Sequence, residues 1–273
     1  MVRTINKIER AFQPGGRRPN EDQMVCTREL FGVFDGASSL VPELFQGQTG
    51  AWWASHLAGS EFARNDGSLE QLSSRANSSL HDAMRGAGVA SADRLACWST
   101  SMAAVRVGEE TLDWAQIGDC LILAIDASGD YRLIPPYESH DTRTLLHLKQ
   151  LIADGDPTPH ASLRPLVEEV RCGMNRDYGV INGEQQALDF LASGSCSLAD
   201  IRHLLIFTDG LLPPTEDPDA EPDFSWLVNL YLKGGLGLVH ERIRTLEAAD
   251  PDCHRYPRFK MHDDVAAVAL SLA

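Results

Sequence analysis

The chain has 273 residues, of which 43% are hydrophobic and 23% charged, and its formal net charge is −15. This length can bury a sizeable core in one large domain or two small ones, and the composition is that of an ordinary globular protein. The acidic balance argues against nonspecific nucleic-acid binding, which needs clustered positive charge. No apolar run approaches the roughly 18 residues that span a bilayer, so we expect no membrane association.

The N-terminus and the cysteines predict a cytoplasmic protein. Residues 1–7 lack the continuous apolar core of a secretory signal. The six cysteines show no CxxC pair and no regular spacing. Such scatter favours reduced thiols over a disulfide framework or a zinc site.

The first half of the chain predicts paired strands, two helices and a run of further strands. Within the first 35 residues, Gln23–Thr27 and Phe31–Phe34 flank a short polar connection. Apolar positions three and four residues apart predict helices over about 42–62 and 69–85. Four strands follow, at 98–107, 111–117, 121–126 and 131–134. Connections this short require antiparallel pairing.

Between residues 135 and 183 the periodic pattern weakens. A helix over 139–152 leads into a loop at 154–160, and 171–182 is irregular and polar. Long irregular segments in a compact domain often cover a functional site. We therefore expect a variable, flap-like insertion over a site in this region.

The remainder of the chain returns to regular elements. The pattern predicts a helix near 184–191, a buried strand over 202–208, helices over 224–233 and 238–248, and a closing strand over 265–272. No repeat and no interdomain linker interrupts the chain. We therefore predict a single domain over residues 1–273, with an α+β layered sandwich fold.

Four acidic clusters each lie beside a predicted strand: Asn20-Glu21-Asp22, Asp35-Gly36, Asp209-Gly210 and Asp263-Asp264. Each cluster alone would be ordinary, because Asp-Gly is a common turn pair. Carboxylates at strand ends are held rigidly, however, and several that converge would repel one another without a cation between them. The pattern predicts a hard-metal site and a metal-dependent hydrolase.

These clusters belong to a longer series of motifs in a recognisable order. The series is Arg17-Arg18-Pro19-Asn20-Glu21-Asp22, Phe31-Gly32-Val33-Phe34-Asp35-Gly36, Ser99-Thr100-Ser101-Met102-Ala103, Ile117-Gly118-Asp119, Leu205-Ile206-Phe207-Thr208-Asp209-Gly210 and Asp263-Asp264-Val265. Together they resemble the metal-dependent Ser/Thr protein phosphatases of the PP2C (PPM) family, in its bacterial single-domain form. The resemblance implies an α/β/β/α four-layer sandwich of two antiparallel sheets flanked by helix pairs.

The resemblance also implies two Mn²⁺ or Mg²⁺ ions at one end of the sandwich. Asp35 would bridge both ions, and the Gly36 carbonyl would bind one of them. Glu21 would approach that same ion directly or through water, while Asp209 and Asp263 would hold the other. Oxygen ligands of this kind suit both metals.

Other positions carry less specific roles. Arg17 matches the family's phosphate-binding arginine and would act in catalysis with Asp35, although Arg18 is an alternative in the same short motif. Asp119 is either a ligand of a looser third ion or a structural turn carboxylate. For Asp22 and Asp264 we expect hydrogen bonding around the ligands.

The implied reaction is hydrolysis of a phosphomonoester by water that two metal ions activate. The substrate would be a phosphoserine or phosphothreonine protein, the opposing enzyme a Ser/Thr kinase, and the phosphatase itself a monomer. Two alternatives stay open: a catalytically weak regulatory or binding protein with this fold, and a phosphatase of a small phosphorylated metabolite. Ala37 stands where eukaryotic members of the family often have a proton-donating histidine, which many bacterial relatives also lack, so the source of the leaving-group proton is not apparent.

Overall fold

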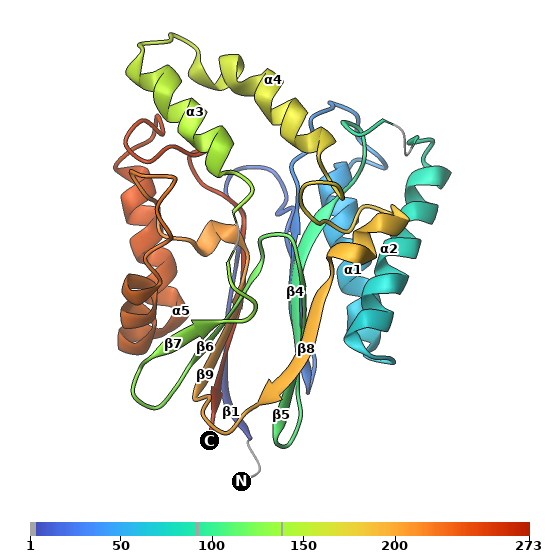
Figure 1. Ribbon diagram of the computed structural model, residues 1–273, viewed down its shortest axis with the longest axis vertical. Helices are drawn as coiled ribbons and strands as arrows, with labels where there is room; N and C mark the ends of the chain where they lie inside the picture. Colours follow the sequence, from blue (N-terminus) through green and yellow to red (C-terminus); the bar gives the residue numbers. More distant parts are fainter. Residues whose placement is uncertain (1–3, 91–92, 138) are drawn as a thin grey trace.

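The computed structural model describes residues 4–90, 93–137 and 139–273, whose strands form two antiparallel sheets. The first sheet holds, in spatial order, β1 (Ile5–Gln13), β10 (Val265–Leu272), β9 (His203–Phe207), β6 (Leu121–Ile125) and β7 (Tyr131–Leu133). The second holds β2 (Gln23–Cys26), β3 (Leu30–Gly36), β4 (Thr100–Val107), β5 (Thr111–Ile117) and β8 (Ala192–Ser197). The sheets face each other, and helices cover their outer faces (Figure 1).

Three apolar clusters separate the layers. One lies between the sheets and includes Phe31 and Val268. A second joins the second sheet to α1 (Gly50–Arg64) and α2 (Leu69–Gly86), and a third joins the first sheet to α5 (Phe224–Ala248). This arrangement confirms the predicted four-layer α+β sandwich.

The helix boundaries follow local capping chemistry. The Ser68 side chain accepts from the Gln71 N–H and the Gln71 side chain accepts from the Ser68 N–H, a capping box that starts α2 where the sequence predicted it. The helix expected from residue 42 begins only at Gly50, with Thr49 as its N-cap. Gln46 and Gly47 have φ values of 53° and 83°, a left-handed turn that no α-helix can include.

The α5 segment contains the two predicted helices, separated at Gly234 and Gly235. Gly235 has a φ of 73°, and a Cβ there would collide with the Glu9 carboxylate. The Leu236 N–H donates to Glu9 Oε2 at 3.1 Å, so this side chain from β1 caps the restarted helix. Glycine is required at the break because only it combines this φ with this close approach.

Strand pairing departs from the predicted order in two places. β2 pairs with β3 as expected, but β1 pairs with β10 from the far end of the chain. The four strands of the expected meander form two hairpins in different sheets, β4–β5 and β6–β7. The chain therefore crosses between the sheets at residues 118–120. The structure also adds two strands, β1 and β8, at positions where the sequence analysis named none, and a 3₁₀ helix over Gln185–Phe190 in place of the α-helix near 184–191.

A helical hairpin occupies much of the 135–183 region. α3 (Thr142–Ala153) agrees closely with the helix predicted over 139–152. α4 (Pro159–Cys172) was not predicted, and it extends from the end of the predicted loop at 154–160 to the start of the irregular stretch at 171–182. Pro159 provides a helix start that the sequence analysis missed. The hairpin lies across one end of the sandwich (Figure 1) and buries few side chains, namely Thr144, Leu148 and Leu163. Among the described residues, no helix combines the length and apolar character needed to cross a bilayer.

Candidate active site

The acidic clusters meet at the end of the sandwich that the α3–α4 hairpin crosses. β3 ends in Asp35-Gly36, and Asp209 follows β9. β2 begins just after Asp22 and β10 just after Asp264. Because Gln23 pairs with Phe34, and Ala267 with Phe207, these starts and ends lie at the same edge of their sheets.

A cavity opens among these strand ends, and we call it the central cavity. It has a volume of about 320 Å³. Its carboxylates come from Asp35, Asp119, Asp141, Asp209 and Asp263, so it joins both sheets and the start of α3. The sequence thus predicted correctly that Asp35, Asp209 and Asp263 converge.

The carboxylates of the central cavity repel one another when they are charged. The side chains of Asp35 and Asp209 are within hydrogen-bonding reach of each other. Burial raises the pKa of both well above the ordinary value, and neighbouring carboxylates, Asp263 among them, raise it further. Such a cluster stores repulsion that a divalent cation would relieve.

Asp22 is buried, and it forms a hydrogen bond beside one of the residues that line the central cavity. Its carboxylate accepts from the Thr208 hydroxyl at 2.8 Å, next to Asp209. Burial raises its pKa well above the ordinary value, and the charge of Asp263 adds to the effect. Asp22 therefore hydrogen-bonds beside a candidate ligand, in the kind of position that we expected.

Asp264 fixes backbone rather than facing the cavity. Its two carboxylate oxygens accept from the Gly15 N–H at 2.6 Å and the Glu21 N–H at 2.7 Å. It thereby ties the start of β10 to the turn that carries Glu21. This contact set favours the hydrogen-bonding role over metal ligation.

Glu21 faces a neighbouring cavity. Its carboxylate accepts from Ser38 Oγ at 3.1 Å and from Thr49 Oγ1 at 2.5 Å, at the N-terminus of α1. It lines a second cavity together with Ser38, Thr49 and Arg18, and not the central one. Glu21 on one side, and Asp209 and Asp263 on the other, thus line two cavities that share Ser38.

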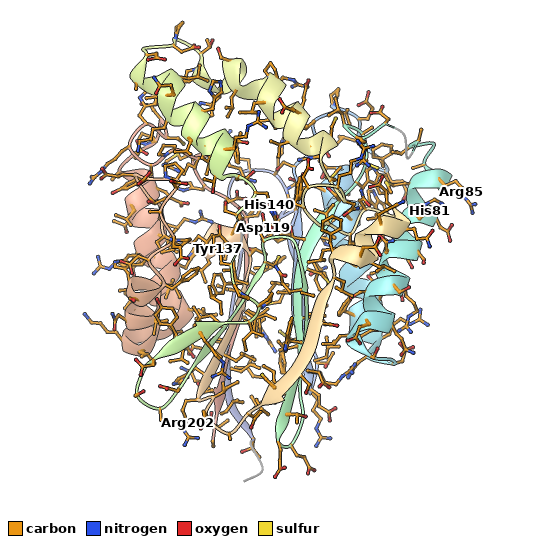
Figure 2. All side chains as sticks on the ribbon, viewed as in Figure 1. His81, Arg85, Asp119, Tyr137, His140 and Arg202 are labelled. Atoms are coloured by element: carbon orange, nitrogen blue, oxygen red, sulfur yellow. The ribbon has the colours of Figure 1, made fainter. Side chains whose placement is uncertain are left out.

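Asp119 sits where the chain crosses between the sheets. Gly118 turns with a φ of 80°, and the Asp119 carboxylate accepts from Ser101 Oγ at 2.6 Å. His140 Nε2 lies 3.5 Å from the other oxygen (Figure 2). Burial would raise the pKa of Asp119, but the contacts with His140 and Ser101 lower it below its ordinary value. Both readings, turn carboxylate and ligand of a third ion, are compatible with this position.

Arg17 does not reach the central cavity. Its side chain is exposed and lines none of the cavities described here, and Arg18 lines only the one beside Glu21. Sequence reasoning missed two other cations, Arg171 and Lys260, which do line the central cavity. Neither lies in a recognised motif, and only the spacing of Lys260 three residues before Asp263 could have drawn attention to it.

The two cations make different contacts. Arg171, at the end of α4, donates from Nη2 to the Ser38 carbonyl at 3.1 Å, while its buried Nη1 has no hydrogen-bond partner. Lys260 Nζ lies 2.7 Å from Asp263 Oδ1 and 3.5 Å from Ser38 Oγ. An unpaired buried N–H is costly, so Arg171 is positioned to accept an anionic ligand.

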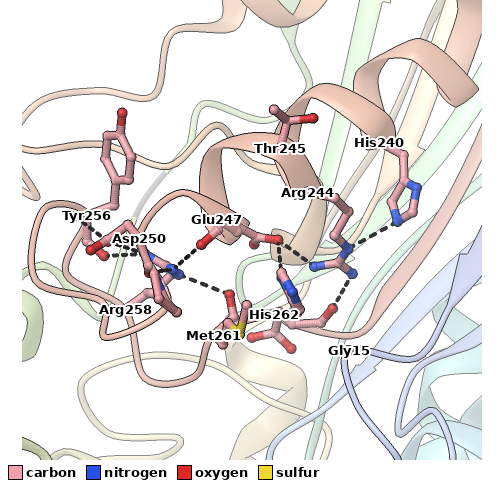
Figure 3. A network of polar contacts seen from close by, with 12 residues as sticks. Gly15, His240, Arg244, Thr245, Glu247, Asp250, Tyr256, Arg258, Met261 and His262 are labelled. Carbon is pink, nitrogen blue, oxygen red and sulfur yellow. Dashed lines mark hydrogen bonds and ion pairs between the residues drawn. The ribbon is translucent and has the colours of Figure 1, made fainter.

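A network of polar contacts holds the segment that carries Lys260 and Asp263 (Figure 3). The buried Asp250 carboxylate accepts from the Tyr256 N–H at 2.9 Å and from Arg258 Nη1 at 2.7 Å. Arg258 Nε donates to the Met261 carbonyl at 3.1 Å, and Arg244 Nη2 to the Asp263 carbonyl at 2.5 Å. These contacts set the direction in which the 256–263 segment faces the cavity.

The carboxylate oxygens of Asp35, Asp209 and Asp263 are the type of ligand that a hard divalent cation binds. These side chains are, however, already in contact with other groups of the protein. Within the described ranges, no three Asp, Glu, His or Cys side chains form a ready metal cage. Asp263 is paired with Lys260, and Asp35 with Asp209. All three side chains offer carboxylate oxygens, and these oxygens repel one another. Mg²⁺ and Mn²⁺ favour such an environment. Ligation by Asp263 would require Lys260 to move aside.

Comparisons with known proteins agree with this geometry. The family model described as protein phosphatase 2C matches residues 18–233. No curated protein matches the sequence. Among solved structures, the catalytic domain of the serine/threonine phosphatase PstP in complex with two manganese ions superposes with a TM-score of 0.62 at 16% identity, covering 100% of this chain and 99% of that one. PstP/Ppp of Mycobacterium tuberculosis gives 0.61 at 16% identity, covering 99% of each chain, and Stp1 of Staphylococcus aureus gives 0.57 at 16% identity, covering 98% and 95%.

Since the family model covers most of the sequence, the chain belongs to the protein phosphatase 2C family. It is a metal-dependent protein phosphatase. The matched residues include Glu21, Asp35 and Asp209 but end before Asp263, which the solved structures cover by fold alone.

Proposed function

We propose that the central cavity is the place where this phosphatase hydrolyses phosphoserine and phosphothreonine monoesters. The observation that carries the proposal is the convergence of Asp35, Asp209 and Asp263 from three strand ends, with raised pKa values for Asp35 and Asp209 that reflect burial and mutual repulsion. Carboxylates arranged in this way are suited to holding positive charge next to a phosphoryl group.

Four carboxylates and one carbonyl would hold the metal ions, Mn²⁺ or Mg²⁺. Asp35 and the Gly36 carbonyl lie on one wall of the cavity, with Asp209 and Asp263 on the other. Glu21 would contribute from the α1 side, where Thr49 and Ser38 hold its carboxylate. When bound, two such ions supply Lewis-acid activation of the attacking water and offset charge on the phosphoryl oxygens.

The chain's own cations would orient the phosphate. Arg171 places a buried, unpaired Nη1 at the cavity, and the fork of a guanidinium matches two phosphate oxygens. Lys260 would add a point charge once it leaves Asp263. Arg17 stays a candidate by resemblance, although its side chain is exposed.

The opposing enzyme, the cellular location and the oligomeric state of this phosphatase are further predictions. A Ser/Thr kinase as the opposing enzyme follows from the substrate class, because phosphoproteins require one. A cytoplasmic location agrees with the free cysteines, and all six are unpaired in the structure. The monomeric state, the single-domain division and the flap-like role of 135–183 are likewise proposals.

The direct test is Mn²⁺-dependent hydrolysis of p-nitrophenyl phosphate by wild type and Asp209→Asn. We expect kcat to fall at least about 100-fold, because removing a ligand should cost no less than disturbing the groups that orient one. Calorimetric titration should show weaker Mn²⁺ binding by the same variant. Asp200→Asn is the matched control, since Asp200 is exposed at the opposite end of the sandwich. Unchanged hydrolysis by Asp209→Asn would overturn the assignment.

A further inference from the structure

A second hollow continues outward from the central cavity, and we call it the proline groove. It has a volume of about 300 Å³ and runs between the 212–222 loop and the 256–260 segment. It shares six lining residues with the central cavity: Asp119, Asp141, Asp209, Phe259, Lys260 and Asp263. A chain held by its phosphate in one hollow therefore extends naturally into the other.

Part of the wall of the proline groove, on the 212–222 loop and the 256–260 segment, is apolar and rich in proline. Prolines line it from both sides, at positions 213, 214, 218, 222 and 257. Phe259 adds an aromatic face that is 40% exposed. Proline has a fixed φ, so a wall built in this way loses little conformational freedom when a ligand binds. Such a surface suits the aliphatic stem of a long side chain.

The outer rim of the groove carries unpaired negative charge. Asp219 and Glu221 both line it and are exposed, and neither has an ion pair or side-chain hydrogen bond to another described residue. The basic side chains that line it, Arg258 and Lys260, already face Asp250 and Asp263. The groove therefore presents net negative charge to a ligand.

The neighbouring acids on the same loop provide a contrast. Glu216 pairs with Arg255 at 2.7 Å and Asp217 lies 3.7 Å from Lys149, and neither lines the groove. The loop thus divides its acids into a pair satisfied by protein cations and a pair that faces the groove. This division distinguishes the groove from a generally acidic surface.

We propose that the proline groove binds an arginine or lysine side chain of the phosphoprotein substrate, one to three residues from the phosphorylated residue. The aliphatic stem lies along the prolines and Phe259, and the charged end faces Asp219 and Glu221. The net charge of −15 steers basic substrates toward the molecule as well. This inference rests on the proposed function and specifies its substrate class.

The test uses phosphothreonine peptides of otherwise neutral sequence with arginine, alanine or glutamate at each position from −3 to +3. Exposed charge pairs are individually weak, so we expect kcat/KM to favour arginine over alanine about three- to tenfold at one or two positions, with glutamate worst. The preference should act mainly through KM and shrink in 0.5 M salt, because the carboxylates are exposed. The Asp219→Asn/Glu221→Gln variant should lose it.

The matched control is Glu216→Gln/Asp217→Asn, which removes the same charge from the same loop outside the groove. It should keep the preference, and both double variants should hydrolyse p-nitrophenyl phosphate at the wild-type rate. The inference is overturned if wild type treats arginine and alanine peptides alike, if Asp219→Asn/Glu221→Gln keeps the preference, or if the control loses it equally. Should wild type not hydrolyse p-nitrophenyl phosphate, the proposed function fails, and peptide binding followed by fluorescence anisotropy still decides the groove in the same way.

Discussion

At the scale of single residues, the sequence predicted most carboxylates of the central cavity but not its cations. Asp35, Asp209 and Asp263 were predictable because each is tied to a strand end by adjacent sequence, and strand ends meet by construction of a sheet. Arg171 and Lys260 reach the same cavity from a helix end and a long loop. Side chains delivered in that way depend on tertiary placement, which no short motif encodes.

The first prediction distinguishes Arg171 from Arg17 as the phosphate ligand. A hydrogen bond to a charged group contributes about 1.5–3 kcal/mol, so Arg171→Ala should lower kcat/KM for p-nitrophenyl phosphate roughly 10- to 100-fold. Arg17→Ala should change it by less than about threefold, because its exposed side chain lines no cavity described here. The measurement is steady-state kinetics at saturating Mn²⁺, with inorganic phosphate as competitive inhibitor.

Arg171→Lys is the companion variant, since it keeps the charge but not the planar fork. It should recover part of the lost activity, and inhibition by phosphate should weaken in the order wild type, lysine, alanine. A large loss in Arg17→Ala with little effect in Arg171→Ala would return the phosphate-binding role to the residue that the motif indicates.

At the scale of elements, the sequence predicted the positions of helices and strands well. It predicted less well which strands pair with each other. Alternation and spacing identified β2, β3 and α2, because each has a local signal. The pairing of β1 with β10 joins opposite ends of the chain, and hydrophobic pattern alone cannot select a partner at that distance. The β5–β6 connection is as short as a hairpin, yet it crosses between the sheets, because Gly118 turns the chain away.

The second prediction concerns the loop that precedes β10. Asp250 is 8% exposed and anchors this loop through Arg258 and three backbone N–H groups. Asp250→Asn leaves the Arg258 guanidinium without its countercharge, and breaking a buried pair of this kind costs about 3–5 kcal/mol. Urea unfolding at pH 7 should show a loss of that order, and Mn²⁺ affinity should fall because Asp263 is less well placed.

The pH dependence of that loss has a definite sign. Burial would raise the pKa of Asp250, but hydrogen bonds from Tyr256, Arg255 and Arg258 hold it below its ordinary value. A folded-state pKa below the unfolded one gives stability that is present above about pH 4 and is lost as pH falls through the folded value. The gap between wild type and Asp250→Asn should therefore be full at pH 6–7 and narrow below about pH 4. A constant gap down to pH 3 would contradict the role of the ionised carboxylate.

At the scale of the whole molecule, the sandwich brings several carboxylates together at the central cavity, although their proximity destabilises the folded state. The hydrophobic layers bury the inner strands, among them β3, β9 and β10. The ends of these strands bring Asp22, Asp35, Asp209 and Asp263 close together. Asp22 and Asp35 have raised pKa values, which means that the fold disfavours their charged forms. The site thus costs stability, as functional clusters often do.

The last prediction follows from that cost. Asp209→Asn removes one charge from the repelling cluster, so in EDTA the variant should be more stable than wild type by about 1–2 kcal/mol, which corresponds to a Tm increase of roughly 2–8 °C for a chain of this size. Mn²⁺ should raise the Tm of wild type, because a ligand that binds only the folded state stabilises it, and should raise that of the variant much less. The control Asp200→Asn should follow wild type in both conditions. Calorimetric scans of the three proteins with and without metal measure these differences in Tm. A variant that is less stable than wild type in EDTA would mean that Asp209 holds the fold together rather than straining it, and the repulsion inferred from its burial beside Asp35 would be wrong.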